Sequence, residues 1–196
     1  MKPKEIVPGV LAVGAQDFDR RLFDALIPLP DGTSYNAYLV RGRDKTALID
    51  AVEPAMLHVL RERLEGVGRI DYVVSNHTEQ DHSGGIPWVL ERHPEAVLLS
   101  SGTAKPMLAD HLGLEASKIR AVADGERLDL GGRTLRFIAT PWVHWPETMS
   151  TYLEEDRVLF SCDWFGSHMA QTDLFVDGVD CILAEAKRYY AEIMMP

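Results

Sequence analysis

The sequence has 196 residues, of which 46% are hydrophobic and 26% charged, the size and composition of one compact domain with a buried core. Thirty acidic residues against 20 basic ones give a net charge of −10, which argues against nucleic acid and anionic membranes as partners. No apolar run approaches the roughly 18 residues that span a bilayer, and the N-terminal segment lacks the apolar stretch of a signal peptide. Two cysteines, Cys162 and Cys181, cannot form a disulfide framework, so we expect a reducing, cytoplasmic setting.

The first half of the chain predicts short strands and then a helix. Strands are expected at Val10–Val13, Tyr35–Val40 and Thr46–Asp50. Pro54 suits a first helical turn, and the apolar residues after it recur at helical spacing through residue 64. A further apolar strand is expected at Ile70–Ser75.

The second half alternates helix and strand before it returns to strands. The predicted order is helix Ile86–Arg92, strand Ala96–Ser100, helix Thr103–Leu112, and then the strands Arg133–Ala139, Met149–Leu153 and Val158–Ser161. A helix is expected over the last stretch, CILAEAKRYYAEIMMP. This order predicts an α/β (α+β) fold in which two sheets are packed together with helices outside.

One segment after a predicted strand places four potential metal ligands within six residues: His77-Thr-Glu79-Gln-Asp81-His82. In an extended or turning loop alternate side chains point the same way, so His77 and Glu79 can bind one ion. Asp81 and His82 then turn toward a second position, and the two glycines that follow let the chain bend into the next helix. A solvated polar loop rarely needs two histidines and two acids at this spacing, so we interpret the segment as metal-binding.

Two later residues extend this candidate site. His144 lies in TPWVHWPET, where two prolines stiffen a loop that follows a predicted strand. Asp163 follows the strand Val158–Ser161 in SCDWFGSH. Taken singly, His144 is more typical of a packed side chain and Asp163 of a turn, so their assignment depends on the loop at residues 77–82.

Together these stretches resemble the metallo-β-lactamase superfamily, whose loop runs H-x-H-x-D-H and is followed by a later histidine and a bridging aspartate. Glu79 replaces the second histidine here, and HTEQDHSGG resembles the flavodiiron proteins (A-type flavoproteins) in particular. Further stretches of that family are similar to GTSYNAYLV, TALID, TPWVHWPETMSTYLEEDRVLFSCDWFGSH and YYAEIMMP. The resemblance implies a metallo-β-lactamase-like αββα sandwich, two mixed sheets with helices outside, here lacking its C-terminal elements.

Carried over residue by residue, the resemblance implies two irons whose ligands are His77, Glu79 and His144 for the first, Asp81 and His82 for the second, and Asp163 as the bridge. In some family members the histidine equivalent to His82 swings away and water replaces it. The remaining histidine of the second iron lies well downstream of the bridging aspartate in the family. His168, only five residues past Asp163, is not assigned that role.

The carboxylates bear on the identity of the metal. Hard carboxylate oxygens suit iron and manganese better than an all-imidazole set does, although zinc ranks higher in intrinsic affinity. Two divalent ions beside the three carboxylates of Glu79, Asp81 and Asp163 leave a net charge of +1. Oxidation to two ferric ions raises this net charge by two. Two iron ions are therefore expected, with zinc as a substitute.

The leading functional hypothesis is a non-haem diiron oxidoreductase that reduces O2 to water, NO to N2O, or both. The resemblance implies electrons from FMN on a flavodoxin-like domain or partner, a donor such as rubredoxin, and a homodimer. An aromatic surround that excludes water is expected from Trp142, Trp145, Trp164, Phe165 and Tyr152. Two alternatives stay open: a diiron oxygen-binding sensor, and a dinuclear metal-dependent hydrolase with a bridging hydroxide as nucleophile.

Two departures from the family pattern stand out. No flavodoxin-like domain fits in this chain, and the last histidine ligand is absent, so we expect residues 1–196 to be the N-terminal part of a longer protein that holds the second iron weakly. Near Arg20–Leu26, where family members often carry a His-Gly-Tyr element, the chain reads Phe23-Asp24-Ala25-Leu26. This change removes a potential proton donor near the bound gas.

Overall fold

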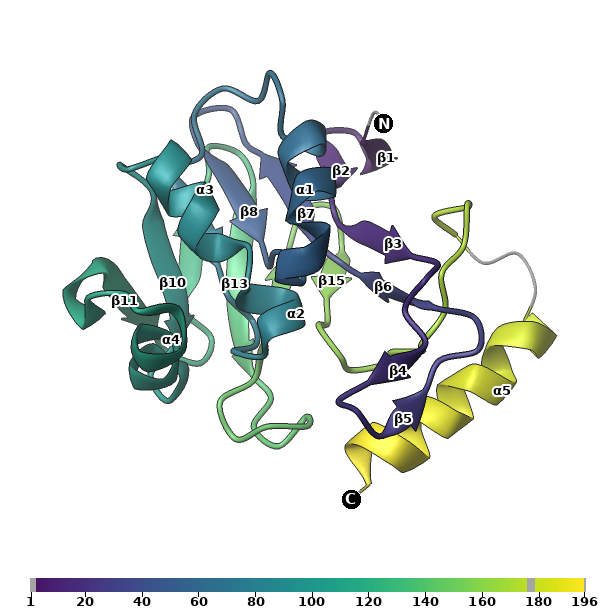
Figure 1. The fold of residues 1–196 in the computed structure, drawn as a ribbon. Coiled ribbons are helices and arrows are strands. Elements are labelled where there is room, and N and C mark those ends of the chain that lie inside the picture. The colour runs from purple at the N-terminus through teal and green to yellow at the C-terminus, as the bar shows by residue number, and fades with distance from the viewer. Residues whose placement is uncertain (1–2, 176–178, 196) are drawn as a thin grey trace.

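The computed structural model describes residues 3–175 and 179–195, with the backbone alone for 179–181, so the side chain of Cys181 and all of Pro196 lie outside the description (Figure 1). Its strands are β1 (Lys4–Val7), β2 (Val10–Ala12), β3 (Ala15–Asp17), β4 (Leu22–Phe23), β5 (Ile27–Pro28), β6 (Thr33–Tyr35), β7 (Tyr38–Arg41), β8 (Thr46–Ile49), β9 (Tyr72–Val74), β10 (Val97–Ser101), β11 (Ile119–Val122), β12 (Arg127–Asp129), β13 (Thr134–Ala139), β14 (Met149–Leu153) and β15 (Val158–Phe160). Its helices are α1 (Leu57–Arg63), α2 (Gln80–Ser83), α3 (Ile86–Arg92), α4 (Ala104–Leu112) and α5 (Val179–Tyr189), with single turns η1 (Pro54–Met56), η2 (Ala116–Lys118) and η3 (Tyr190–Met194). Within these residues, no helix is both long and apolar enough to cross a membrane.

Two main sheets form the centre of the molecule. The larger sheet has the order β1-β2-β7-β8-β9-β10-β11 and is mixed, because β8 to β11 pair in parallel and the other neighbours pair antiparallel. The smaller sheet, β12-β13-β14-β15, is antiparallel throughout the described strands. Two short ribbons, β3–β6 and β4–β5, stand beside them (Figure 1).

Successive residues of the central strands face two different cores. Leu48, Val73 and Leu98 pack toward apolar residues of α1, α3 and α4, whereas Val74 and Leu99 pack toward the smaller sheet. This alternation is the period of two that a strand imposes on its side chains. Because the central strands are covered on both faces, they read as continuous apolar runs in the sequence.

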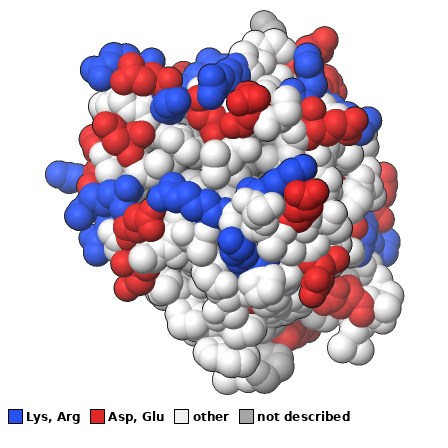
Figure 2. All heavy atoms as spheres, turned by 90° about the vertical axis from the view of Figure 1, so that its left-hand side faces the viewer, with Lys and Arg blue, Asp and Glu red and all other residues white. Residues whose placement is uncertain are grey.

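The helices α1, α3 and α4 lie on one face of the larger sheet, and α5 lies apart from them beside the β4–β5 ribbon (Figure 1). Arg188 of α5 donates a hydrogen bond from Nη2 to the Pro28 carbonyl oxygen at 2.6 Å, which ties the helix to β5. Figure 2 shows the side where β11 and α4 lie: basic and acidic side chains are interspersed there, so the net charge of −10 does not form one acidic patch on that side.

One predicted strand is wrong in an informative way. Tyr35–Val40 is two strands, β6 and β7, because the chain breaks at residues 36 and 37. The carbonyl oxygen of Ala37 accepts hydrogen bonds from the amides of Val13 and Gly14, at 2.8 and 3.1 Å, so β6 leaves the larger sheet and pairs with β3. That break carries Thr33 to the wall of the candidate site.

Candidate metal centre

The predicted ligands occupy three connections at strand ends, namely the β9–α2 segment (His77, Glu79, Asp81 and His82), the β13–β14 loop (His144) and the residues after β15 (Asp163). The first connection belongs to the larger sheet and the other two to the smaller sheet. The amide of Met149 donates to the carbonyl oxygen of Asn76 at 2.9 Å, which joins the two sheets beside the site. The site therefore depends on how the two sheets are packed together.

Asn76 anchors the start of the ligand-bearing loop. Its amide nitrogen donates to Asp50 Oδ1 at 2.7 Å and its Nδ2 donates to Asp50 Oδ2 at 3.0 Å. Thr151 of β14 donates from Oγ1 to Asn76 Oδ1 at 2.7 Å. Burial raises the pKa of Asp50 to about 6. Since this buried network is tied to three strands, His77 begins from a fixed backbone position.

The rest of the loop is one helical turn rather than extended chain. Ser83 of α2 donates from Oγ to the carbonyl oxygen of Thr78 at 2.6 Å, which closes the turn. A Cβ at Gly84 would lie 2.5 Å from Pro54 Cδ, so glycine lets α2 pack against η1. The helical turn presents Asp81 and His82 to a different side of the site from His77.

On one side of the site, three side chains surround a single oxygen of Asp163. Its Oδ2 lies 3.5 Å from His77 Nε2 and 3.3 Å from His144 Nε2. Glu79 Oε2 lies 3.1 Å from the same atom of His77 and 3.3 Å from the same atom of His144. All four residues thus offer donor atoms that lie within 4.8 Å of one another.

On the other side, the second oxygen of Asp163 meets the α2 residues. His82 Nε2 lies 3.0 Å from Asp163 Oδ1 and 3.6 Å from Asp81 Oδ2. The other ring nitrogen, Nδ1, lies 3.5 Å from Cys162 Sγ. Burial raises the pKa of the Cys162 thiol well above its usual value, so Cys162 is a neutral neighbour of His82.

The electrostatics of the site favour protonated histidines beside ionised carboxylates. Burial opposes charge on His144, but the nearby Asp163 and Glu79 raise its pKa to about 9. Burial also opposes charge on Glu79, yet His144 and His77 lower its pKa to about 2. On the other side, burial raises the pKa of Asp81 to about 7. Protons on the histidines therefore take the place that cations would occupy.

Metal ions fit this arrangement. Asp81 Oδ1 on the second side is buried, and no donor in residues 3–175 or 179–195 forms a hydrogen bond with it. On the first side, Asp163 Oδ2 is buried and faces the Nε2 atoms of His77 and His144, which are ligand atoms when neutral. A buried carboxylate oxygen without a partner is costly unless a cation is nearby. Each side of Asp163 therefore has a buried carboxylate oxygen beside imidazole and carboxylate donors, which matches one cation on each side.

Glu147 is a functional residue that the sequence interpretation missed. Its side chain is fully buried, and Oε1 accepts hydrogen bonds from His77 Nδ1 at 2.8 Å and from the amide of Thr78 at 3.0 Å. The bond to Nδ1 leaves Nε2 of His77 free to face Glu79 and Asp163. An acid three residues after His144 was a signal, but its partner lies 70 residues away in sequence.

The aromatic surround differs from the predicted one. Trp145 packs against the His77 ring with centroids 5.1 Å apart, but Trp142 and Phe165 are 72% and 71% exposed. A cavity of about 50 Å³ adjoins the ligands, and its aromatic and aliphatic wall comes from Phe23, His168, Tyr189 and Ile193. The wall thus comes from the ribbon β4–β5, the segment after β15, and the segment from α5 to η3. Because these segments lie far apart in the sequence, no local pattern showed that they meet.

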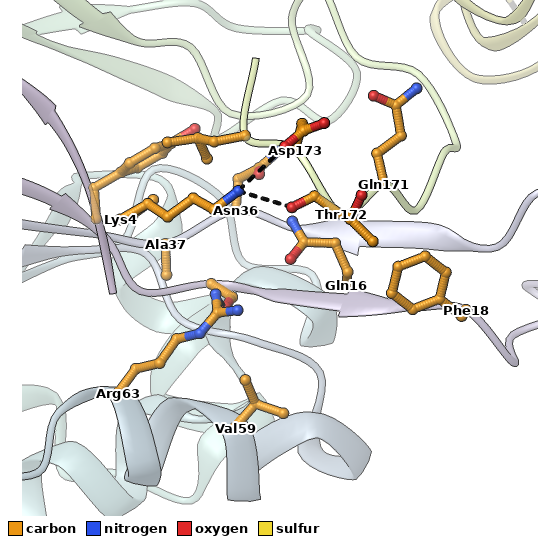
Figure 3. A pocket seen from close by; sticks show the side chains of 14 residues that line it. Lys4, Gln16, Phe18, Asn36, Ala37, Val59, Arg63, Gln171, Thr172 and Asp173 are labelled. Atoms are coloured by element: carbon orange, nitrogen blue, oxygen red, sulfur yellow. Dashed lines mark hydrogen bonds and ion pairs between the residues drawn. The ribbon is translucent and has the colours of Figure 1, made fainter. Parts of the chain in front are cut away.

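A second cavity, of about 220 Å³, lies away from these ligands and contains none of them. Figure 3 shows its walls, which include Gln16, Asn36 and Gln171. Lys4 donates from Nζ to the carbonyl oxygen of Thr172 at 2.8 Å (Figure 3). This bond holds the segment after the site against β1.

Residues 33–196 match the family described as ODP family beta lactamase. The chain belongs to this family. It is 42% identical over 199 residues to the type A flavoprotein fprA of Rhodobacter capsulatus, covering 99% of this chain and 46% of the relative. It is 39% identical over 201 residues to a nitric oxide reductase of Moorella thermoacetica, covering 100% of this chain and 50% of the relative.

Solved structures agree with these relatives. This ODP-family chain superposes on rubredoxin oxygen:oxidoreductase from Desulfovibrio gigas with a TM-score of 0.93 at 33% identity, covering 98% of this chain and 49% of that one. The predicted resemblance to flavodiiron proteins and the predicted metallo-β-lactamase-like fold are thereby confirmed. The chain spans about half the length of the curated relatives it matches.

Proposed function

We propose that this domain holds two iron ions and, with an electron donor, reduces O2 to water, NO to N2O, or both. The observation that carries the proposal is the position of Asp163, whose two carboxylate oxygens face two separate sets of donor atoms. One carboxylate shared between two sets is the arrangement that a dinuclear centre requires. Zinc would fit the same donors, but the three carboxylates favour iron chemically.

In this proposal His77, Glu79 and His144 hold the first ion, Asp81 and His82 hold the second, and Asp163 bridges them. Two ferrous ions held by these residues would supply electrons for the reduction of a diatomic molecule in the adjoining cavity. Glu147 fixes the ring of His77 through its 2.8 Å hydrogen bond. The wall formed by Phe23 and its neighbours adjoins a cavity of about 50 Å³, which has room for a diatomic gas beside the ligands.

An electron donor requires access to the ions, and Glu79 lies at a suitable boundary. It lines both the small cavity and an open groove of about 580 Å³, whose other walls include Met107, His111 and Trp145. The groove is roomy enough for a planar aromatic ring system such as a flavin. We place the donor, an FMN-bearing domain or a partner in a homodimer, against this groove.

The names of the relatives support both substrates. One relative is named a nitric oxide reductase, and the solved structure from Desulfovibrio gigas is titled a rubredoxin oxygen:oxidoreductase. Rubredoxin is accordingly a suitable donor to test. A cytoplasmic location agrees with a site that depends on reduced iron.

The test is anaerobic loading of the full chain with ferrous iron, followed by mixing with O2 or NO. We expect two iron ions per chain, oxidation of both by O2, and one N2O for every two NO consumed, since 2 NO + 2 e⁻ + 2 H⁺ gives N2O + H2O. The matched controls are the zinc-loaded chain and Asp163→Asn. Preferential binding of two zinc ions with ester hydrolysis and no N2O would overturn the proposal in favour of a hydrolase.

A further inference from the structure

The imidazole of His168 forms part of the wall of the cavity beside the candidate metal ligands. It lies in the segment after β15, five residues past Asp163, and lines the same cavity as Asp81 and Asp163. Its Nε2 is buried, and no group in the described parts of the chain forms a hydrogen bond with it. A buried ring nitrogen without a partner calls for an explanation.

The other ring nitrogen has a defined partner. Thr33 of β6 is 3% exposed, and its Oγ1 lies 3.1 Å from His168 Nδ1. Among residues 3–175 and 179–195 no other group hydrogen-bonds to that hydroxyl. If Nδ1 donated to it, the hydroxyl hydrogen would be left buried without an acceptor, which is costly. The roles at this pair depend on the tautomer of His168, and with the Thr33 hydroxyl as donor every hydrogen of the pair is matched once an acceptor lies beside Nε2.

The charge state of the ring sets how many hydrogens its two nitrogens carry. Burial lowers the pKa of His168 below the usual value for histidine. The charges that face it are Asp163, Glu79 and Glu192, which oppose this shift, and Arg188, which adds to it. A neutral imidazole has one N–H group, so with Nδ1 accepting from Thr33 the hydrogen lies on Nε2.

The ring is also held in place. Phe23 of β4 packs against it with centroids 5.0 Å apart, and Tyr189 of α5 meets it edge-on at 4.9 Å. Two aromatic rings and one hydrogen bond, from three separate elements, fix its plane and its direction. A donor that is fixed before a ligand arrives needs no reorganisation to bind it.

We propose that His168 donates a hydrogen bond from Nε2 to the small anion or partly reduced diatomic molecule that occupies the cavity. The identity of that ligand rests on the proposed function. The inference adds to that function the protein group that would donate a hydrogen bond to the ligand atom nearest the cavity wall. Negative charge grows on that atom as electrons arrive, so a neutral N–H donor there stabilises the reduced form more than the gas itself.

The test uses azide as the probe, titrated calorimetrically into the full metal-loaded chain. His168→Phe keeps an aromatic ring in the wall but removes the donor, and we expect azide to bind about threefold to tenfold more weakly. His168→Gln keeps an N–H donor and is expected to recover most of this affinity. His58→Phe is the matched control, because His58 is exposed on α1.

A second variant separates hydrogen bonding from packing. Thr33→Val keeps the shape of the side chain but cannot donate to Nδ1, so the ring hydrogen can lie on either nitrogen. Azide is therefore expected to bind more weakly, as in His168→Phe. Unchanged azide affinity in both His168→Phe and Thr33→Val, with metal content equal to the wild type, would overturn the inference. Azide binds without turnover, so a chain that reduces neither gas still reports on His168.

Discussion

The two sides of Asp163 are built differently. The first side takes its donors from two connections, because His77 and Glu79 come from the β9–α2 segment and His144 from the β13–β14 loop. The second side takes Asp81 and His82 from the single short helix α2. Buried Glu147 also supports the first side. The nearest counterpart on the second side is the neutral thiol of Cys162.

This difference predicts two unequal sites. Three donors divided between the ends of two strands from different sheets cannot all move together, so the first side is organised before a metal arrives. Two neighbouring residues on one turn of helix move with that helix. We therefore expect metal to fill the first side at lower concentration than the second, and the following predictions test that order.

The largest effect is expected from Asp163→Asn, which acts on both sides at once. The amide is neutral and offers a single oxygen, so the charge that both ions share is lost. We expect the second ion to be lost entirely and the first to bind at least about 100-fold more weakly. Iron per chain after chelator competition measures this effect, with His58→Gln as the control. Retention of two ions would mean that Asp163 is not the bridge.

Glu147→Gln is expected to separate the two sides. The amide oxygen of glutamine can accept the same two bonds that Glu147 Oε1 accepts, but it carries no negative charge, so the charge-assisted bond from His77 Nδ1 weakens and the ring is held less firmly. The first ion should bind about 10- to 100-fold more weakly, the usual cost of losing such a partner, while the second changes by less than about threefold.

The matched control for that measurement is Glu95→Gln, because Glu95 is exposed on the surface. The two binding steps can be resolved by titrating ferrous iron anaerobically against a competing chelator. Equal weakening of both steps would show that Glu147 stabilises the site as a whole rather than its first side.

A smaller effect is expected from pH. Raising the pH should lower the stability of the metal-free chain but raise the affinity for metal. His144 has a folded pKa of about 9, raised by Asp163 and Glu79 despite its burial. In the metal-free chain its contribution to stability is complete below about pH 6.5 and is lost as the pH rises through about 9. Metal binding requires the neutral ring, so affinity should rise by about tenfold per pH unit over the same interval.

Thermal unfolding of the metal-free chain and metal titration, both between pH 7 and 9, check these two slopes. His144→Gln removes the titrating ring and should flatten its share of each slope. Parallel slopes in the empty and loaded chain would contradict the assignment of His144 to the first side.

Much of the fold follows from local pattern. The helix Ile86–Arg92 and the strand Met149–Leu153 have the predicted bounds, because glycine, proline or acidic turn residues flank each of them in the sequence. Tyr35–Val40 was predicted as one strand because no local signal records that Ala37 is held by the backbone of residues 13 and 14. The helical turn at 80–83 was missed because four residues are too few to show a helical period.

The sequence by itself determined the chemistry of the site: which donor types are present, their spacing between residues 77 and 82, and the strands that precede them. Only the tertiary structure decided how those donors divide between the two oxygens of Asp163, and which other residues serve them. The roles of Glu147, Thr33 and His168 could not be assigned from local sequence, because each acts through a partner between 70 and 135 residues away. Packing of the two sheets and of α5 sets those distances, and it is a property of the whole fold rather than of any segment.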